Sequence, residues 1–304
     1  MGTETTNTVV VGVTGAGENT SALKYAVHYA HRHGSTVQLV HVLHQAMPPP
    51  PPSTLLTYHD FKEIGEQFVS DAKRELQGIA ELMGVEVPCT TKVLQGSPAH
   101  QLRDAAADAR MLVTQHRHVG RLGRFFTGST TIRLAAHAHC PVVSVPGDWS
   151  LSTTPGRVTV GIHERGGPPE VMAAAFEAAA DLGAMLQVVH AWRIDSMYAD
   201  VIEDRVDDDW RARAIEHLRP GIEAARADQP SVEYDISIEH AWPEEALKRA
   251  AETSDLLVIG RHGSVPLEPE HLGYLARMLI REAPCPVMVV PPAHQPAPGT
   301  VTTS

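Results

Sequence analysis

The chain contains an internal repeat of domain length, and no other feature of the sequence restricts the fold as much. Residues 7–43 match residues 156–192 along their whole length, and residues 137–146 (HAHCPVVSVP) match residues 282–291 (EAPCPVMVVP). The longer match contains a β-branched strand, a glycine-containing turn, an alanine-rich helix, a glycine and a second strand with a Val-His pair. A repeat of this length indicates two copies of one domain rather than a solenoid of small units.

The length and composition of the chain agree with two globular domains. Its 304 residues are 43% hydrophobic and 20% charged, which supplies enough apolar material for two domains of ordinary size. We place the first domain at residues 7–146 and the second at residues 156–292, and we expect residues 293–304 to form a disordered tail. The segment GDWSLSTTPG, residues 147–156, then links the two domains.

Within each copy the apolar residues alternate between the period of a strand and the period of a helix. The first copy predicts strands near 8–13, 37–43, 86–94, 110–114 and 142–145, and helices near 19–33, 60–83, 98–107 and 129–138. The second copy predicts strands near 157–162, 185–192, 232–238, 255–259 and 286–290, and helices near 169–182, 204–227, 243–252 and 271–282.

Several of these strands, such as TVVVGV (8–13) and LLVIG (256–260), are apolar without alternation. This pattern is typical of strands that are covered by helices on both faces of a sheet. Alternating strands and helices favour a mostly parallel, doubly wound sheet. The predicted fold class is therefore α/β, with two tandem copies of a five-stranded parallel doubly wound sheet of Rossmann-like type. In such sheets ligands bind at the carboxyl ends of the strands, beside the crevice where the strand order reverses.

Charge and cysteine usage argue against several classes of function. The net charge is −11, whereas nucleic-acid binding normally needs a basic face. Cys89, Cys140 and Cys285 form no CxxC pair and no disulfide framework, which indicates a reducing compartment. Neither a signal peptide nor an apolar run of membrane-spanning length is visible. We therefore expect a cytoplasmic protein with neither a nucleic-acid nor a membrane partner.

In the two copies of the internal repeat, the chain resembles a tandem-domain universal stress protein of the UspA-like family. The resemblance covers nearly the whole chain and rests on the VGV or VGI first strand with its turn and alanine-rich helix, and on the CPV segment near each domain's end. It implies an adenine-nucleotide alpha-hydrolase-like fold in each domain. It also implies an intramolecular pseudo-dimer of the two domains through their final strands, which end at residues 146 and 291, and further pairing into a homodimer.

Some members of that family bind ATP, and these carry the motif G-x2-G-x9-G-[ST] after the fourth strand and usually an Asp at the end of the first strand. The glycines let backbone N–H groups approach phosphate oxygens, and the last pair opens a helix whose N-terminus favours an anion. The second copy keeps Gly260, Gly263 and Gly273 at the family spacing. In that copy Tyr274 replaces the Ser or Thr, and His163 stands at the Asp position.

The first copy has lost a different part of the same motif. It keeps Gly128 and Ser129, followed by Thr130, whereas Gln115 replaces the first glycine. His118 replaces the second glycine, and Thr14 stands at the Asp position. All nine of the retained or position-equivalent residues are candidate ligands of an adenine nucleotide: Gly260, Gly263, Gly273, Tyr274 and His163 in the second copy, and Gly128, Ser129, Thr130 and Thr14 in the first.

Two groups of side chains on the loop of the first copy leave alternatives open. Arg117, Arg121 and Arg124 either rebuild an anion site at this loop or form a solvated surface. His116 and His118 either bind a metal or lie on the surface. No Cys, Asp or Glu stands at a supporting spacing, so we expect surface histidines and no metal site.

The sequence contains no catalytic motif. His41 and His190 occupy matching places in the second strand of each copy, and we interpret them as features of the fold rather than as catalytic bases. A nucleophile elbow, a P-loop lysine motif and a metalloprotease helix are all missing from the sequence. We therefore expect that the protein is not an enzyme.

The sequence is compatible with three functions. The first is a cytoplasmic, non-enzymatic stress-response module that senses a ligand or docks partners and has degenerate ATP-binding motifs in both domains. The alternative is an ATP-binding protein or slow ATPase that uses the second domain, with Mg²⁺. The third is a purely structural partner, in which side chains such as His118 and Tyr274 fill the crevices at the strand ends.

Overall fold

The computed structural model describes residues 6–15, 18–44, 58–116, 129–150, 156–163, 167–193, 199–261 and 272–293, and it describes the side chains within these ranges except those of residues 58–60, 129 and 199–209. The predicted tail after residue 293 lies outside them.

Strands and helices alternate as the sequence predicts. The strands are β1 (Thr6–Gly12), β2 (Thr36–His44), β3 (Cys89–Gly96), β4 (Ala109–His116), β5 (Val142–Pro146), β6 (Arg157–Ile162), β7 (Met185–Trp192), β8 (Tyr234–His240), β9 (Leu256–Gly260) and β10 (Val287–Val290). The helices are α1 (Thr20–His33), α2 (Tyr58–Leu82), α3 (Pro98–Ala105), α4 (Ser129–His137), α5 (Pro169–Leu182), α6 (Ala199–Arg226), α7 (Pro243–Ala251) and α8 (Tyr274–Glu282).

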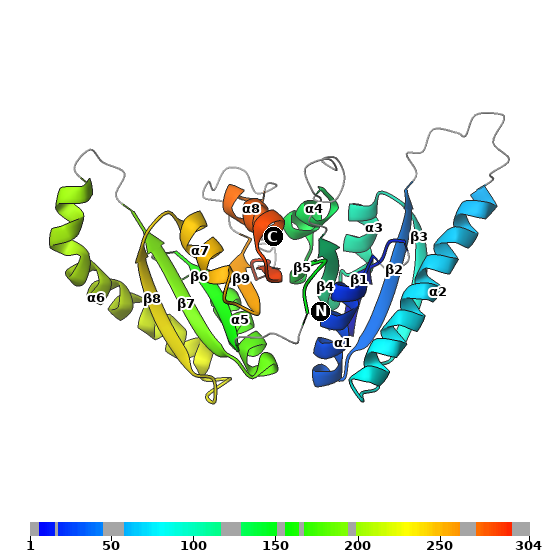
Figure 1. The fold of residues 1–304 in the computed structure, drawn as a ribbon, viewed down its shortest axis with the longest axis horizontal. Coiled ribbons are helices and arrows are strands. Elements are labelled where there is room, and N and C mark those ends of the chain that lie inside the picture. Colours follow the sequence, from blue (N-terminus) through cyan, green and yellow to red (C-terminus); the bar gives the residue numbers. More distant parts are fainter. Residues whose placement is uncertain are drawn as a thin grey trace, which may run out of the picture.

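All of these strands belong to one sheet, in the order β3-β2-β1-β4-β5-β10-β9-β6-β7-β8. Within each half the strands are parallel, and the strand order reverses between β1 and β4 and between β6 and β9. The predicted fold class is confirmed. The two halves splay apart on either side of the junction, with α4 and α8 at one end of it and α1 and α5 at the other (Figure 1).

The junction between the halves is an antiparallel pair formed by the final strand of each half. β5 pairs with β10 so that Val143 lies opposite Met288. Every residue of both strands is buried. The prediction that the two copies pack together through their final strands is confirmed. The sheet is therefore continuous through the molecule, and neither of these strands is left as a free edge.

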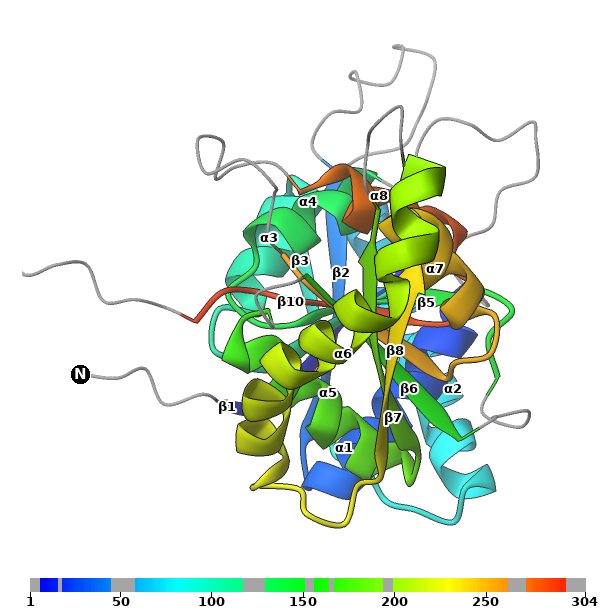
Figure 2. The ribbon, with the colours of Figure 1, turned by 90° about the vertical axis from the view of Figure 1, so that its left-hand side faces the viewer.

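Sheet twist explains how two parallel halves are joined by one antiparallel pair. Adjacent strands are rotated by about 20–25°, and this rotation accumulates from the outer strands to the junction. As a result, β5 and β10 run across the direction of β2 and β7 (Figure 2). The carboxyl ends of the long strands in both halves then lie at the end of the molecule that carries α4 and α8 (Figure 1).

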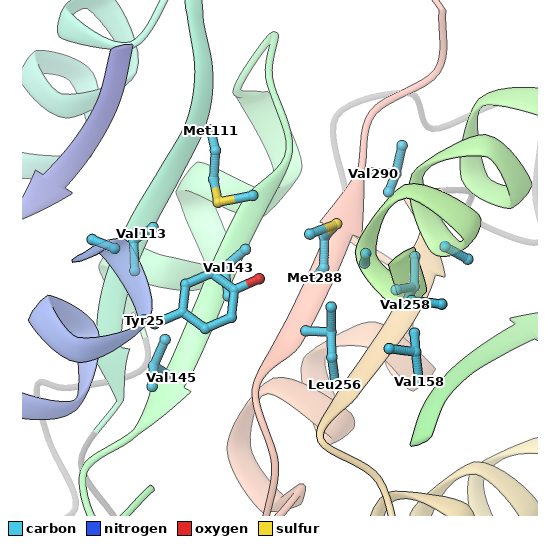
Figure 3. Packing of buried hydrophobic residues seen from close by; sticks show 14 of the residues in the cluster. Tyr25, Met111, Val113, Val143, Val145, Val158, Leu256, Val258, Met288 and Val290 are labelled. Carbon is cyan, nitrogen blue, oxygen red and sulfur yellow. The ribbon is translucent and has the colours of Figure 1, made fainter. Parts of the chain in front are cut away.

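Helices cover both faces of the sheet, and each face has one hydrophobic core. Val9 and Val11 of β1 face the core that includes α1, α2, α5 and α6, whereas Val10 faces the core that includes α3, α4, α7 and α8. Both cores contain residues from both halves. Figure 3 shows this for the first core, in which Val143 and Tyr25 of the first half lie across from Met288 and Leu256 of the second.

His41 and His190 support the strand ends in the two halves in the same way. Nδ1 of His41 lies 2.9 Å from the carbonyl oxygen of Val13, and Nδ1 of His190 lies 3.2 Å from the carbonyl oxygen of Ile162. Each ring therefore fixes the chain where it leaves the first strand of its half. The interpretation of these histidines as features of the fold agrees with these contacts.

Close packing at Gly161 of β6 gives a test of the fold. A Cβ at Gly161 would lie 2.7 and 2.9 Å from the two methyl carbons of Leu247, which is buried on α7, whereas a Cβ at the matching Gly12 of β1 would lie 3.1 Å from one methyl carbon of Leu102. We expect Gly161→Ala to lower the free energy of unfolding by about 1–3 kcal/mol because the core is overpacked. Gly12→Ala should have a smaller effect. Urea denaturation of both variants measures this, and a larger loss for Gly12→Ala would contradict the expectation.

Candidate functional site

In the first half, Gln115 closes the crevice at the strand ends. Its side chain leaves the end of β4 and reaches the N-terminus of α1, where Oε1 accepts hydrogen bonds from the N–H groups of Ser21 (3.0 Å) and Ala22 (3.2 Å). The first N–H groups of a helix have no partner within the helix, and anions often bind there. Gln115 therefore occupies the place that a phosphate group would take at this helix.

The turn after β1 in the first half is closed by its own side chains. Oδ1 of the buried Asn19 accepts a hydrogen bond from the N–H of Thr14 (3.0 Å), and its Nδ2 donates to the carbonyl oxygen of Thr14 (3.2 Å). The Thr14 hydroxyl donates to Oε2 of Glu18 (3.3 Å). A carboxylate beside Thr14 repels the phosphates of a nucleotide. The described residues of this crevice do not fit a nucleoside triphosphate.

The other predicted residues of the first half lie at the start of α4. Thr130 is half-buried in the first turn, whereas Gly128 and the side chain of Ser129 lie outside the described residues. The hydroxyls of Thr131 and Thr114 lie 3.1 Å apart and join this helix to β4. His118 and the arginines at 117, 121 and 124 also lie outside the described residues.

The second half has no side chain at the position of Gln115. Gly260 ends β9, so nothing reaches from that position to the N-terminus of α5. That helix is preceded by Pro168 and begins with Pro169, and Oε1 of Glu170 accepts a hydrogen bond from the N–H of Ala293 (2.9 Å). His163, at the end of β6, is exposed to solvent. The described residues of the second half therefore have no counterpart of the hydrogen bonds that Gln115 makes in the first half.

Tyr274 does not fill the second crevice. Gly273 precedes α8 as its N-cap, and Tyr274 is the first residue of the helix. The Tyr274 side chain is 67% exposed, so the hypothesis that it blocks the strand ends is wrong. Gly263 lies outside the described residues.

The residues next to Gln115 and Gly260 join the two halves through a reciprocal pair of contacts. Nε2 of His116, in the first half, lies 3.1 Å from the carbonyl oxygen of Arg281 at the end of α8. Arg261, in the second half, donates from Nη1 to the carbonyl oxygen of Ala138, just after α4 (2.5 Å). His116 is buried, so its prediction as a surface histidine is wrong. Because a helix end leaves carbonyl groups without partners, both contacts satisfy such groups across the junction.

An aromatic cluster that sequence reasoning missed lies at the carboxyl ends of β7 and β8. Trp192 stacks on Trp210 with 5.3 Å between the ring centroids, and it lies 4.6 Å from the ring of His240. The guanidinium of Arg193 lies over the Trp242 ring at 4.9 Å. Trp210 and Trp242 are exposed at 45% and 39%. The only signal in the sequence was Trp192 at the end of the repeated segment, where the first half has Leu43.

A model of the universal stress protein family matches residues 5–146 and again residues 156–291. The chain belongs to the universal stress protein family. A universal stress protein of Mycolicibacterium smegmatis is 27% identical over 289 residues, covering 93% of this chain and 97% of the relative. One from Mycobacterium tuberculosis is 26% identical over 313 residues, covering 95% of this chain and 96% of the relative.

Solved structures share the whole tandem fold. A universal stress protein from Archaeoglobus fulgidus superimposes with a TM-score of 0.65 at 17% identity, covering 94% of this chain and 97% of the other. The cytoplasmic domain of a prokaryotic cation chloride cotransporter does so with a TM-score of 0.55 at 11% identity, covering 93% of this chain and 95% of the other. At these identities the likeness shows the fold alone. Among the described residues, no helix has the length and apolar character needed to cross a membrane.

The contact of Gln115 with α1 is testable by substitution. Gln115→Ala should lower the free energy of unfolding by about 0.5–2 kcal/mol, because two N–H groups at the helix N-terminus lose their acceptor. Gln115→Glu keeps an acceptor at the same place and adds a charge that the helix dipole favours, so it should be less destabilising. Guanidinium denaturation compares the two. Equal losses for both variants would contradict the capping role.

Two of the three cysteines should be unreactive in the folded universal stress protein. Cys140 and Cys285 are buried, and burial raises the pKa of each thiol to about 12. Because the thiolate is the reactive form, we expect Ellman's reagent at pH 8 to modify only the half-buried Cys89 until the protein is denatured. Cys89→Ser should remove the reaction of the native protein. Rapid modification of a second thiol in that variant would contradict this account.

Proposed function

We propose that this universal stress protein is a non-enzymatic stress-response module in which ligand sensing is confined to the second half. The observation that carries the proposal is the difference between Gln115 and Gly260. Gln115 caps α1 and closes the crevice of the first half. Gly260 leaves the equivalent space of the second half without a side chain. The first half then acts as a fixed partner, and the second half keeps the one crevice that a ligand enters.

The aromatic surface of the second half supports the same assignment. Trp192 ends β7, which pairs with β6, and β6 pairs with β9, the strand that ends at Gly260. Trp210 and His240 pack against Trp192, and flat rings of this kind are surfaces on which nucleotide bases stack. An adenine nucleotide with Mg²⁺ is therefore the ligand to test, with its base toward this surface and its phosphates toward Gly260 and Gly273.

The proposal does not include catalysis. Hydrolysis of ATP needs a water molecule in position to attack and a group that orients this water. Among the described residues of the second crevice, His163 and Tyr274 are exposed, and we assign neither of them to position or orient the water. The homodimer remains a prediction from the sequence. Because β5 already pairs with β10, such a dimer needs a surface other than the final strands.

Titration calorimetry with ATP and Mg²⁺ tests the proposal. The wild-type chain should bind one nucleotide, and Gly260→Gln should abolish binding because it places in the second half the side chain that closes the first. The matched control is Gln115→Ala, which changes the first half at the same position. It should not remove binding to the second half, and the Glu18 carboxylate beside Thr14 still disfavours a nucleotide in the first half. Phosphate release should not exceed the blank, and circular dichroism checks that both variants are folded.

Two results of the calorimetry would contradict the proposal in different ways. Loss of binding in Gln115→Ala but not in Gly260→Gln would place the ligand in the first half and overturn the assignment. If the wild type does not bind the nucleotide, the hypothesis of nucleotide sensing is wrong, and partner docking is then the proposed function of the module.

A further inference from the structure

A cavity of about 380 Å³ lies between the two halves, on the side of the sheet that α1 and α5 cover. Tyr25 and Tyr29 of α1 line one wall, and Ala174 and Ala178 of α5 line the other. Met111, Leu256 and Met288 line it from the strands. Pockets that hold small molecules have volumes of about 300–1,000 Å³. Residues 111 and 256 stand near the starts of β4 and β9, so the cavity is at the opposite ends of the strands from the crevices described above.

Divergence between the two copies of one helix creates this space. α1 and α5 correspond in the repeat, and each ends at a glycine in the left-handed conformation, Gly34 (φ 59°) and Gly183 (φ 61°). Counting back from these glycines, Tyr25 corresponds to Ala174 and Tyr29 corresponds to Ala178. Large rings on one helix therefore face methyl groups on the other. The space that a second pair of rings would occupy remains as the cavity.

Ion pairs at one end of the cavity hold the two helices at their distance. Nε2 of His33 lies 2.7 Å from Oδ2 of Asp181, and Arg110 donates from Nη2 to Oε1 of Glu177 (2.9 Å). Nε of Arg32 lies 3.8 Å from Oδ1 of Asp181. The ligand atoms of His33, Glu177 and Asp181 lie within 4.8 Å of one another, but Arg32 and Arg110 already balance both carboxylates. The cluster is therefore an ion-pair network rather than a metal site, and it adds no net charge that would attract an ionic ligand.

Two polar side chains of the cavity wall are those of Tyr25 and His28. Tyr25 is only 7% exposed, and Figure 3 shows its hydroxyl pointing into the space between the halves, toward Met288. Nε2 of His28, which also lines the cavity, is buried without a partner. Buried polar groups in proteins are almost always hydrogen-bonded. The unpartnered Nε2 of His28, on the same cavity wall as the Tyr25 hydroxyl, therefore indicates a missing partner inside the cavity.

The side chains of the cavity wall indicate which class of molecule would be this missing partner. Burial raises the pKa of Tyr25 and, together with Arg32, lowers the pKa of His28, so both groups are uncharged at neutral pH. His31 on the same helix also lowers the pKa of His28, whereas Asp181 across the junction raises it. Each neutral group both donates and accepts hydrogen bonds, depending on its rotamer or tautomer. Methionine side chains such as Met111 and Met288 make favourable contacts with aromatic rings and adapt to their shape.

We propose that the cavity between α1 and α5 binds a small uncharged phenol, of the size of a cresol, whose hydroxyl hydrogen-bonds to the Tyr25 hydroxyl and to Nε2 of His28. Its ring lies between Met111 of the first half and Met288 of the second. Because both halves contribute to the wall, the bound molecule stabilises their association at the junction. This site is independent of the nucleotide crevice of the second half.

Ligand-observed NMR and titration calorimetry on the full chain test the proposal, with phenol and p-cresol as the probes. Both probes should bind to the wild type. Tyr25→Phe should weaken binding by about 5- to 10-fold, because one hydrogen bond is lost. Ala178→Phe should abolish it, because the new ring fills the space. The matched control is Tyr234→Phe, whose hydroxyl bonds to Glu223 far from the cavity, and this variant should bind as the wild type does.

Three results would overturn the proposal. The first is no binding of either probe to the wild type at millimolar concentration. The second is unchanged binding in a folded Ala178→Phe variant, because the probes then bind elsewhere. The third is unchanged affinity of the probes for Tyr25→Phe. This variant alone tests the proposal if Ala178→Phe does not fold.

Discussion

The antiparallel pair of β5 and β10 is the interaction on which the rest of this structure depends. Each is the last strand of its half, and each alone would leave an apolar edge open to other chains. Their pairing removes both edges and joins two five-stranded units into one sheet. Because the hydrophobic core on each face then runs through both halves, the halves share a common interior rather than meeting at a surface.

An approximate two-fold relation at the junction brings corresponding residues of the repeat face to face. Two identical copies would place Tyr29 against a tyrosine and Arg32 against an arginine. The second copy instead has Ala178 and Asp181 at these positions. Steric fit and opposite charge therefore replace a clash and a repulsion, and Arg32 and His33 pair with Asp181 across the junction. The differences between the two copies are therefore complementary at the junction, and the residues that differ also line the cavity between α1 and α5.

The two copies also differ at the ends of their strands. The first half has internal hydrogen bonds there, through Gln115 and Asn19. The second half has Gly260 at the position of Gln115, and it has exposed aromatic rings near the ends of β7 and β8. Arg261 is turned away from the crevice and bonds to the first half, so a residue that looks suited to bind phosphate serves the junction. The motif residues alone do not separate these roles.

The sequence by itself determined the two domains, the order of strands and helices and the parallel sheets, because these follow from apolar periodicity and from glycine and proline positions that act locally. The resemblance to the family implied that the halves meet at their final strands. Only the tertiary structure decided what Gln115, His116 and Tyr274 do. The partners of Gln115 lie 94 and 93 residues away in the chain, and the partner of His116 lies 165 residues away. Such contacts depend on how helices are placed by the completed sheet, and no local pattern encodes that placement.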